Sequence, residues 1–269
     1  MILIAEKLNG SIPSCAQAIK EKDGTYIKDL AKFQAESGVD YIDCCASVIE
    51  NELDILTWMI DAIQSVTDCP ISIDSPDVSV IIEAMPLCKK PGMFNSISGE
   101  GNKMDLAFPV LAKPENAKWH IMALLCDDTG IPKSAEKRIE VFDKIMVKAA
   151  HYGIEDSRIH VDPAVEMLCT TDDGEGASMI LDVMKHIKKT RPKVHISGAI
   201  SNISFNLPVR RLVNQAFAVL AINAGMDSAV LDPLNKDLRG VILAAEAMLG
   251  MDDFCAEYVS AYREGIFSK

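Results

Sequence analysis

Short apolar segments alternate with longer segments of helical period along the whole chain, and this alternation restricts the fold more than any other feature. The apolar segments are typical of strands that are buried on both faces of a parallel sheet. The predicted strands are Ile2–Glu6, Asp40–Cys45, Pro70–Asp74, Gly92–Ser98, Trp119–Leu125, Arg158–Asp162, Lys193–Gly198 and Ser228–Asp232. The helical period predicts helices over Asp29–Ser37, Leu53–Val66 and Val78–Cys88, and an outer helix within Asp252–Tyr262. The sequence therefore predicts the α/β class.

The strands recur at a spacing of roughly 30 residues, which suits right-handed crossovers that close into a (β/α)8 TIM barrel. The chain of 269 residues is long enough for one such barrel, and no linker divides it, so one domain is predicted over residues 1–269. A doubly wound open sheet is the alternative. It is disfavoured because no G-x-G-x-x-G follows the first strand and because polar residues follow nearly every strand.

Composition excludes several classes of partner. The net charge is −12, and lysines and arginines form no stripe, which argues against nucleic acids and anionic membranes as partners. No apolar segment approaches the roughly 20 residues of a membrane span, and the apolar start of the chain is too short for a signal peptide. The eight cysteines form no C-x-x-C pair and are expected to be reduced thiols. A soluble cytoplasmic protein is predicted.

Carboxylates and amides collect where the predicted strands end. In a barrel these side chains line one mouth, where catalysis takes place. An aspartate can accept hydrogen bonds from a ring N–H and an adjacent amino group, and an asparagine both donates and accepts. This mixture indicates a binding site for a neutral heterocycle. The residues at these ends are Glu6, Asn9, Asp43, Asp74, Asn95, Asp127, Asp162, Asn202 and Asp232.

Some of these polar side chains have a simpler interpretation. Asp127 and Asp232 are expected to cap the helices that follow them, and Asp232 precedes Pro233 as an N-cap residue often does. His160 and His195 lie inside apolar strands and are expected to be core residues.

Nucleophilic and metal chemistry receive little support. Cys44 and Cys45 lie in an apolar strand without a neighbouring base and are interpreted as small buried side chains. A zinc site from Cys45, Cys69, Cys169 and a histidine has a spacing unlike known zinc motifs, so no metal site is predicted.

Six segments, in order along the chain, resemble one enzyme family. "SNISFNLPVRRLVNQAF" (Ser201–Phe217) resembles the S-N-x-S-F-G-L-P-x-R-x-x-x-N-x-x-F segment of the methyltetrahydrofolate:corrinoid protein methyltransferases. These enzymes are related to the folate domain of cobalamin-dependent methionine synthase and to dihydropteroate synthase. The other similar segments are "IAEKLNG" (4–10), "ISIDS" (71–75), "MFNSIS" (93–98), "TGIPKSAEKR" (129–138) and "HVDP" (160–163).

The resemblance implies a pterin-binding TIM barrel. It implies methyl transfer between N5 of 5-methyltetrahydrofolate and the cobalt of a corrinoid (cobalamin) carried by a partner protein. Family members are usually homodimers, and neither the folate nor the corrinoid is expected to be a tightly bound cofactor. The family's pterin contacts fall on Asp74, Asn95 and Asp162, and its asparagine beside N5 falls on Asn202. Asn202, Asp74 and Asp162 are the expected catalytic set.

Asn202 cannot act as a general acid, because a neutral amide has no proton to lose at pH 7. It can donate a hydrogen bond that strengthens as charge develops on N5. Asp43, Glu6, Asn9 and Arg210 are expected to complete the pterin pocket. Arg210 is compatible both with the carboxylate tail of the substrate and with a surface ion pair.

The sequence departs from the family where Asn206 replaces a common glycine, which could alter the loop or add a pterin contact. A dihydropteroate synthase is the main alternative. It is disfavoured because "NGSIPSCAQ" does not resemble the N-x-T-P-D-S-F loop, because the last strand lacks Arg-x-His, and because few cations could bind pyrophosphate. A non-catalytic pterin-binding subunit is the other alternative, and the presence of Asn202 weighs against it.

Overall fold

The computed structural model describes residues 1–46, 51–170 and 177–267, and in these residues eight parallel strands form one sheet. The order of the strands is β7-β6-β5-β4-β3-β2-β1-β8. Every predicted strand is present, with ends that differ by a few residues. The strands are β1 (Ile2–Asn9), β2 (Tyr41–Cys45), β3 (Ile71–Asp74), β4 (Met93–Gly99), β5 (His120–Asp127), β6 (Ile159–Asp162), β7 (His195–Ile196) and β8 (Ser228–Leu231).

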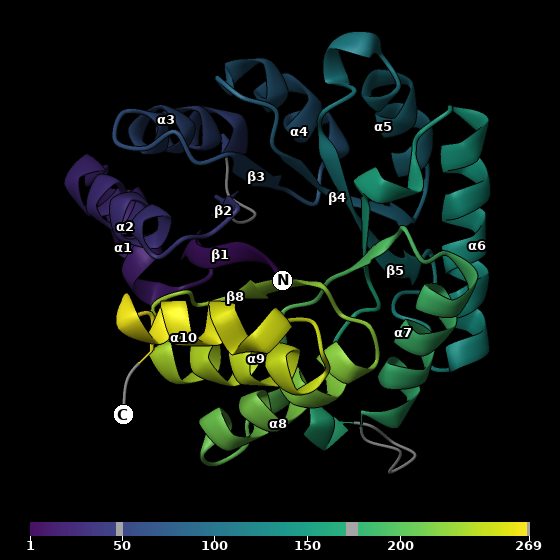
Figure 1. Cartoon of the computed structure of the whole chain (residues 1–269). Helices are drawn as coiled ribbons and strands as arrows, with labels where there is room; N and C mark the ends of the chain where they lie inside the picture. The colour runs from purple at the N-terminus through teal and green to yellow at the C-terminus, as the bar shows by residue number, and fades with distance from the viewer. Residues whose placement is uncertain (47–50, 171–176, 268–269) are drawn as a thin grey trace.

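Backbone contacts between β7 and β8 close the sheet into a barrel. Ala199 and Val230 form a parallel bridge, and the Val230 amide donates to the Gly198 carbonyl oxygen at 3.1 Å. The Asp227 amide donates to the Ile196 carbonyl oxygen at 3.2 Å. The helices surround this barrel (Figure 1). The predicted (β/α)8 barrel is therefore confirmed, and the open sheet is excluded.

The α-helices follow the strands around the barrel, and short 3-10 helices complete the loops. The α-helices are α1 (Pro13–Glu21), α2 (Gly24–Glu36), α3 (Glu52–Gln64), α4 (Val78–Ala84), α5 (Lys103–Leu111), α6 (Ala135–His151), α7 (Ser178–Thr190), α8 (Arg210–Asn223), α9 (Lys236–Met248) and α10 (Ala256–Arg263). The 3-10 helices are η1 (Met85–Leu87), η2 (Pro114–Asn116), η3 (Asp156–Arg158), η4 (Leu168–Thr170), η5 (Ile200–Ser204) and η6 (Asp253–Cys255).

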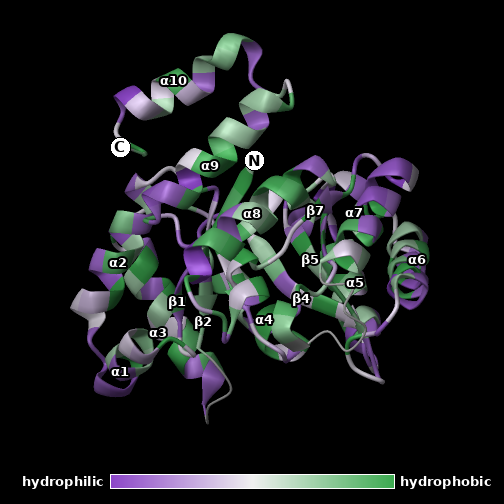
Figure 2. Cartoon of the chain, turned by 90° about the horizontal axis from the view of Figure 1, so that it is seen from below, coloured by the Kyte–Doolittle hydropathy of each residue, from purple (hydrophilic) through white to green (hydrophobic). Residues whose placement is uncertain are grey.

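Helix α1 is absent from the sequence prediction. It begins at Pro13, directly after a turn at the end of β1, and proline suits the first position of a helix because its missing N–H needs no partner there. Cys15, Ala18 and Ile19 form its buried face. The outer helix predicted within Asp252–Tyr262 is present as η6 and α10, and α10 lies beyond α9 (Figure 2).

A small apolar plug fills the interior of the barrel. Ile4, Met93 and Met122 are fully or almost fully buried, and Tyr41 and Val230 pack against them. These side chains come from several strands and point to the barrel axis rather than to the helices. The larger core lies between the strands and the helices. Among the described residues, no helix is long and apolar enough to cross a membrane.

Candidate active site at the carboxyl ends of the strands

A cavity of about 630 Å³ opens at the carboxyl ends of the strands. This volume lies within the range of sites for small ligands. All eight residues that the sequence indicates for the pocket line this cavity: Glu6, Asn9, Asp43, Asp74, Asn95, Asp162, Asn202 and Arg210. Strand register explains part of this convergence, because Asp74 pairs with Asn95 across β3 and β4. Met122 and Val230 belong to both the plug and the cavity wall, so the plug closes the inner end of the cavity.

A hydrogen bond joins the side chains of Asp43 and Asn95 at the wall of the cavity. The Asn95 Nδ2 atom donates a hydrogen bond to Asp43 Oδ1 at 3.1 Å, and the Ser72 hydroxyl donates to the same oxygen at 2.6 Å. Burial and the nearby Asp74 raise the pKa of Asp43 well above its usual range. The hydrogen bond from Asn95 ties its amide to the buried Asp43 side chain and so fixes the orientation of that amide.

Asp74 and Asp162 face the cavity from β3 and β6. Burial raises the pKa of Asp74 to about 6, and Glu52 adds to this shift. Burial also raises the pKa of Asp162 to about 6, although its carboxylate accepts a hydrogen bond from the Ala164 amide at 2.8 Å. Both groups are mainly ionised at neutral pH. Each can accept hydrogen bonds from N–H groups of a heterocycle.

Arg138 braces the loop that follows Asp162, a role that the sequence analysis missed. The Arg138 side chain is fully buried on α6. Its Nε donates to the Pro132 carbonyl oxygen at 2.9 Å, and one terminal nitrogen donates to the Ala164 carbonyl oxygen at 2.8 Å. It also forms an ion pair with Glu166. Arg138 thus ties the loop after β5 to the loop after β6. Its place at the end of the "TGIPKSAEKR" motif was the available signal.

Asn202 lies in η5, and Arg210 holds this short helix in place. The Arg210 Nε donates to the Ser204 hydroxyl at 3.0 Å, and a terminal nitrogen donates to the Ser201 carbonyl oxygen at 2.8 Å. The guanidinium also lies 4.4 Å from the ring centroid of Phe205. Arg210 lines the cavity, but these contacts give it the role of supporting the loop that carries Asn202.

The departure at Asn206 has a conformational reason. Its φ of 63° is in the left-handed region, which glycine adopts freely and asparagine tolerates better than most residues. The side chain is exposed, and its Nδ2 lies 3.9 Å from the Met167 sulfur. Asparagine can therefore adopt the left-handed backbone conformation that this position requires.

Glu6 lies on β1 at the side of the cavity closest to η5. The Ser201 hydroxyl donates to Glu6 Oε2 at 3.4 Å. Burial and the charge of Asp232 raise the pKa of Glu6 to about 7. Asn9, at the end of β1, accepts hydrogen bonds from the Ser11 amide at 2.8 Å and the Ser11 hydroxyl at 2.7 Å, so it shapes the turn beside the cavity.

The expectation that Asp127 and Asp232 cap helices is wrong. The N-cap residues are Ser134 for α6 and Asn235 for α9. Both aspartates instead stabilise tight turns, because their carboxylates reach the amide two residues later before the helix begins. Asp232 also forms an ion pair with Lys7 at 3.0 Å.

Three histidines, His120, His160 and His195, lie near the amino ends of their strands, opposite the cavity. His160 is fully buried, as the sequence analysis predicted for a core residue, and its Nδ1 lies 3.0 Å from the Ser228 hydroxyl. Its Nε2 lies 2.8 Å from Nδ1 of His120, which the sequence analysis did not single out. The prediction that His195 is a core residue is wrong, because its side chain is 25% exposed at the start of β7 and contacts Asp227 at 3.1 Å. The ring nitrogens of these histidines therefore contact one another or neighbouring polar side chains at the amino ends of the strands.

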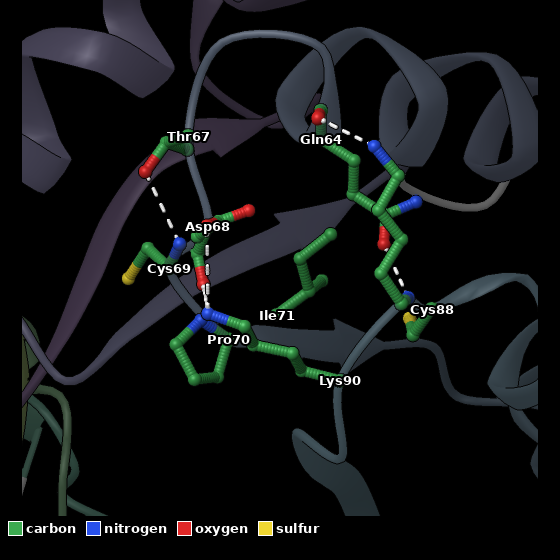
Figure 3. Close-up of a pocket in the computed structure, with 9 residues that line it drawn as sticks. Gln64, Thr67, Asp68, Cys69, Pro70, Ile71, Cys88 and Lys90 are labelled. Atoms are coloured by element: carbon green, nitrogen blue, oxygen red, sulfur yellow. Dashed lines mark hydrogen bonds and ion pairs between the residues drawn. The ribbon is translucent and has the colours of Figure 1, made fainter.

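Cys44 and Cys45 are buried in β2, as predicted. The described residues include all eight cysteines, and no disulfide joins them. Within the described part of the chain, no group of three or more histidine, cysteine or acidic side chains is arranged to hold a metal ion. A second hollow lies at the amino end of β3, between Gln64, Pro70 and Cys88 (Figure 3). Its volume of about 10 Å³ suits at most one water molecule.

The fold of the barrel and the carboxylates and amides at its mouth can be compared with those of known protein families. Residues 9–232 match the family of pterin binding enzymes, and the chain is a member of that family. It is 44% identical over 266 residues to the methylcorrinoid:tetrahydrofolate methyltransferase of Eubacterium limosum, an alignment that covers 98% of this chain and 97% of that protein. The family resemblance inferred from the motifs is thereby confirmed.

Two more distant proteins are also similar to the chain. The methionine synthase of Mycobacterium leprae is 24% identical over 251 residues, which are 88% of this chain and 21% of that enzyme. The structure of a dihydropteroate synthase from Coxiella burnetii in complex with pteroic acid has a TM-score of 0.67 and 17% identity, covering 94% of this chain and 93% of that chain. This last similarity supports the fold alone.

Proposed function

We propose that the chain transfers a methyl group between N5 of 5-methyltetrahydrofolate and the cobalt of a corrinoid bound to a partner protein. The near full-length similarity to a methylcorrinoid:tetrahydrofolate methyltransferase carries this proposal. The cavity is compatible with it, because its polar groups suit a heterocycle and a reduced corrinoid is itself a strong nucleophile. The protein then has to bind, orient and protonate the folate, and needs no nucleophile of its own.

The pterin ring is proposed to bind between β3, β4 and β6. The carboxylates of Asp74 and Asp162 accept hydrogen bonds from ring N–H and amino groups. Asn95, held by Asp43, contributes an amide of fixed orientation. Ionised carboxylates make stronger hydrogen bonds than neutral acceptors, so these two residues supply most of the polar binding energy.

Asn202 is proposed to lie beside N5. A tertiary amine leaves poorly unless its nitrogen gains a proton or a strong hydrogen bond while the C–N bond breaks. The Asn202 amide can donate such a bond, and its position in η5 is fixed in advance by the contacts of Arg210. Preorganised donors of this kind contribute about 3 kcal/mol to the stability of a transition state.

Dihydropteroate synthesis is the rival activity, and the charge of the cavity disfavours it. A departing pyrophosphate needs cations. Among the described residues that line the cavity, Arg210 is the one cationic side chain, and it already binds its own loop. A binding subunit without activity remains the second alternative, which a turnover measurement decides.

The partners follow from the reaction. The corrinoid protein has to approach the mouth of the barrel, since N5 must reach the cobalt. Both the folate and the corrinoid are proposed to be substrates rather than tightly bound cofactors. A homodimer is proposed from the resemblance, and exposed apolar side chains of α8, including Leu212, Val219 and Leu220, offer a surface that a second copy can cover. A cytoplasmic location is proposed, because eight cysteines without a C-x-x-C pair are typical of reduced thiols.

The test is anaerobic mixing of the protein with 5-methyltetrahydrofolate and chemically reduced cob(I)alamin, followed by the loss of cob(I)alamin absorbance. Wild-type protein is expected to form methylcobalamin, and Asn202→Ala to be slower by about 100-fold. Asn206→Gly, a change in the same loop that preserves its left-handed backbone, is the matched control and should retain activity. Folate binding without turnover would favour the inactive subunit, and neither binding nor turnover would reject the proposed function.

A further inference from the structure

The proposed reaction needs a group that exchanges a proton with N5, and this inference rests on that proposed function. When the methyl group leaves, the electron pair of the C–N5 bond remains on N5 and takes up a proton. In the opposite direction, N5 loses a proton as it gains the methyl group. The candidates are the carboxyl groups that line the cavity: Glu6, Asp43, Asp74 and Asp162.

Three of these carboxyl groups are poorly suited to the exchange. Asp43 is almost fully buried, and its Oδ1 already accepts hydrogen bonds from Ser72 and Asn95, so its geometry suits a support for the Asn95 amide. Asp74 and Asp162 each have a pKa of about 6, so at neutral pH they are mainly carboxylates without a proton to give. Their ionised form suits hydrogen bonds from the pterin ring.

Glu6 lies on the side of the cavity that carries the proposed N5 partner. The hydrogen bond between Ser201 and Glu6 joins η5 to β1, and Ser201 directly precedes Asn202. All three residues line the same cavity. A proton held by Glu6 can therefore reach a ligand atom beside Asn202 directly or through the Ser201 hydroxyl.

The surroundings of Glu6 keep both of its protonation states available. Burial is the main cause of its pKa of about 7, and the charge of Asp232 adds to it. Lys7 on β1 and Arg210 on α8 lower the pKa, as does the Ser201 hydrogen bond. The buried Asp43 on β2 also faces Glu6. A pKa near the working pH is what acid–base catalysis in both directions requires.

We propose that the Glu6 carboxyl group is the acid–base catalyst of methyl transfer. In transfer to the corrinoid, the electron pair of Co(I) forms the Co–C bond, the C–N5 bond breaks, and the proton of Glu6 goes to N5. Glu6 is left as a carboxylate. In transfer from methylcobalamin to tetrahydrofolate, an electron pair of N5 forms the new bond to the methyl carbon, the Glu6 carboxylate takes the N5 proton, and the electron pair of the Co–C bond returns to cobalt.

The test compares pH–rate profiles in the two directions. Transfer to cob(I)alamin needs protonated Glu6, so its rate should fall as the pH rises through about 7. Transfer from methylcobalamin to tetrahydrofolate needs the carboxylate, so its rate should fall as the pH drops through the same value. Glu6→Gln should remove the transition near pH 7 from both profiles and lower both rates by about 100-fold, whereas the titration of Asp74 and Asp162 near pH 6 remains. The ligands titrate identically with both proteins, so the difference between the profiles isolates Glu6.

Two further variants move the profile rather than remove it. Asp232→Asn should shift the midpoint to lower pH, because a charge that raises the pKa of Glu6 is lost. Ser201→Ala should shift it to higher pH, because a hydrogen bond that lowers this pKa is lost. These variants decide the question even if Glu6→Gln fails to fold. Unmoved midpoints, or wild-type rates in Glu6→Gln, overturn the role of Glu6 alone. Absence of turnover by wild-type protein at every pH overturns the proposed function and this role together.

Discussion

The two ends of the barrel use buried polar side chains in opposite ways. At the carboxyl ends, burial raises the pKa of Glu6, Asp74 and Asp162, and these groups face an open cavity. At the amino ends, hydrogen bonds from His195 and Lys188 outweigh burial and lower the pKa of Asp227 to about 2. The apolar plug separates the two ends. At the carboxyl ends the polar groups line an open cavity, whereas at the amino ends they form hydrogen bonds and ion pairs with one another.

The acids at the two ends of the barrel change the free energy of unfolding in opposite directions as the pH changes. A carboxyl group whose folded pKa is raised binds its proton more tightly in the folded state, so the mouth acids reduce stability as the pH rises from about 4 to 7. Asp227 has a lowered pKa, so its stabilising contribution is present above about pH 4 and is lost as the pH falls toward 2. The buried carboxyl groups at the mouth therefore lower the stability of the protein at neutral pH, an effect that is common at functional sites.

The largest expected effect separates activity from stability at the mouth. Asp162→Asn should lower the rate of methyl transfer by about 100-fold, because a charged acceptor for the pterin ring is lost. Its free energy of unfolding at pH 7 should stay the same or rise, since the variant no longer buries a charge and its side-chain oxygen can still accept from the Ala164 amide. Turnover and urea unfolding, measured on one preparation, check both. If Asp162→Asn retains activity but has a lower free energy of unfolding, Asp162 stabilises the fold and the contrast between the two ends is contradicted.

The opposite end should give the opposite result. Asp227→Asn is expected to lower the free energy of unfolding by about 2 kcal/mol, because the ion pair with Lys188 at 2.7 Å is lost and the neutral amide binds the Ile196 amide more weakly. Methyl transfer by the folded protein should be unchanged, since the plug separates Asp227 from the cavity. Urea unfolding and turnover again provide the measurements, and a selective loss of turnover would place function at this end too.

A smaller effect concerns the histidines. Burial lowers the pKa of His160 and of His120, so the folded state resists their protonation, and their contribution to stability should fall as the pH drops below about 6.5, opposite in sign to that of the mouth acids. Compared with wild type, His160→Gln should therefore raise the free energy of unfolding at pH 5.5, relative to that at pH 7.5, by about 1 kcal/mol. Urea unfolding at the two pH values tests this, with His151→Gln on the exposed surface of α6 as the control. If the free energy of unfolding changes by the same amount between the two pH values in wild type and in His160→Gln, the proposed effect of burial on His160 is contradicted.

The sequence allowed the strands and the pocket residues to be predicted because both depend on local pattern. A buried strand is a short apolar segment, and the residue that ends it lies at the mouth of a barrel whatever the helices do. Asp74, Asn95 and Asp162 follow from this rule. The turns of Asp127 and Asp232 were misassigned because capping and turn formation use the same residue types.

The missed features depend on contacts between distant segments. The His120–His160 contact joins residues that are 40 positions apart, and nothing near either residue indicates it. Arg138 reaches carbonyl groups of the loop before α6 and of the loop after β6, and a buried arginine on an amphipathic helix cannot be told from an exposed one in sequence. Helix α1 was missed because its first turn follows a segment of turn-forming residues.

The placement of the pterin ring is the central claim, and a crystal structure with bound 5-methyltetrahydrofolate tests it most directly. The account predicts the ring in the cavity at the carboxyl ends, with hydrogen bonds to Asp74, Asn95 and Asp162, with N5 beside the Asn202 amide and with the Glu6 carboxyl group in reach of N5. A folate bound elsewhere on the chain, or bound here with N5 turned away from Asn202, would contradict it.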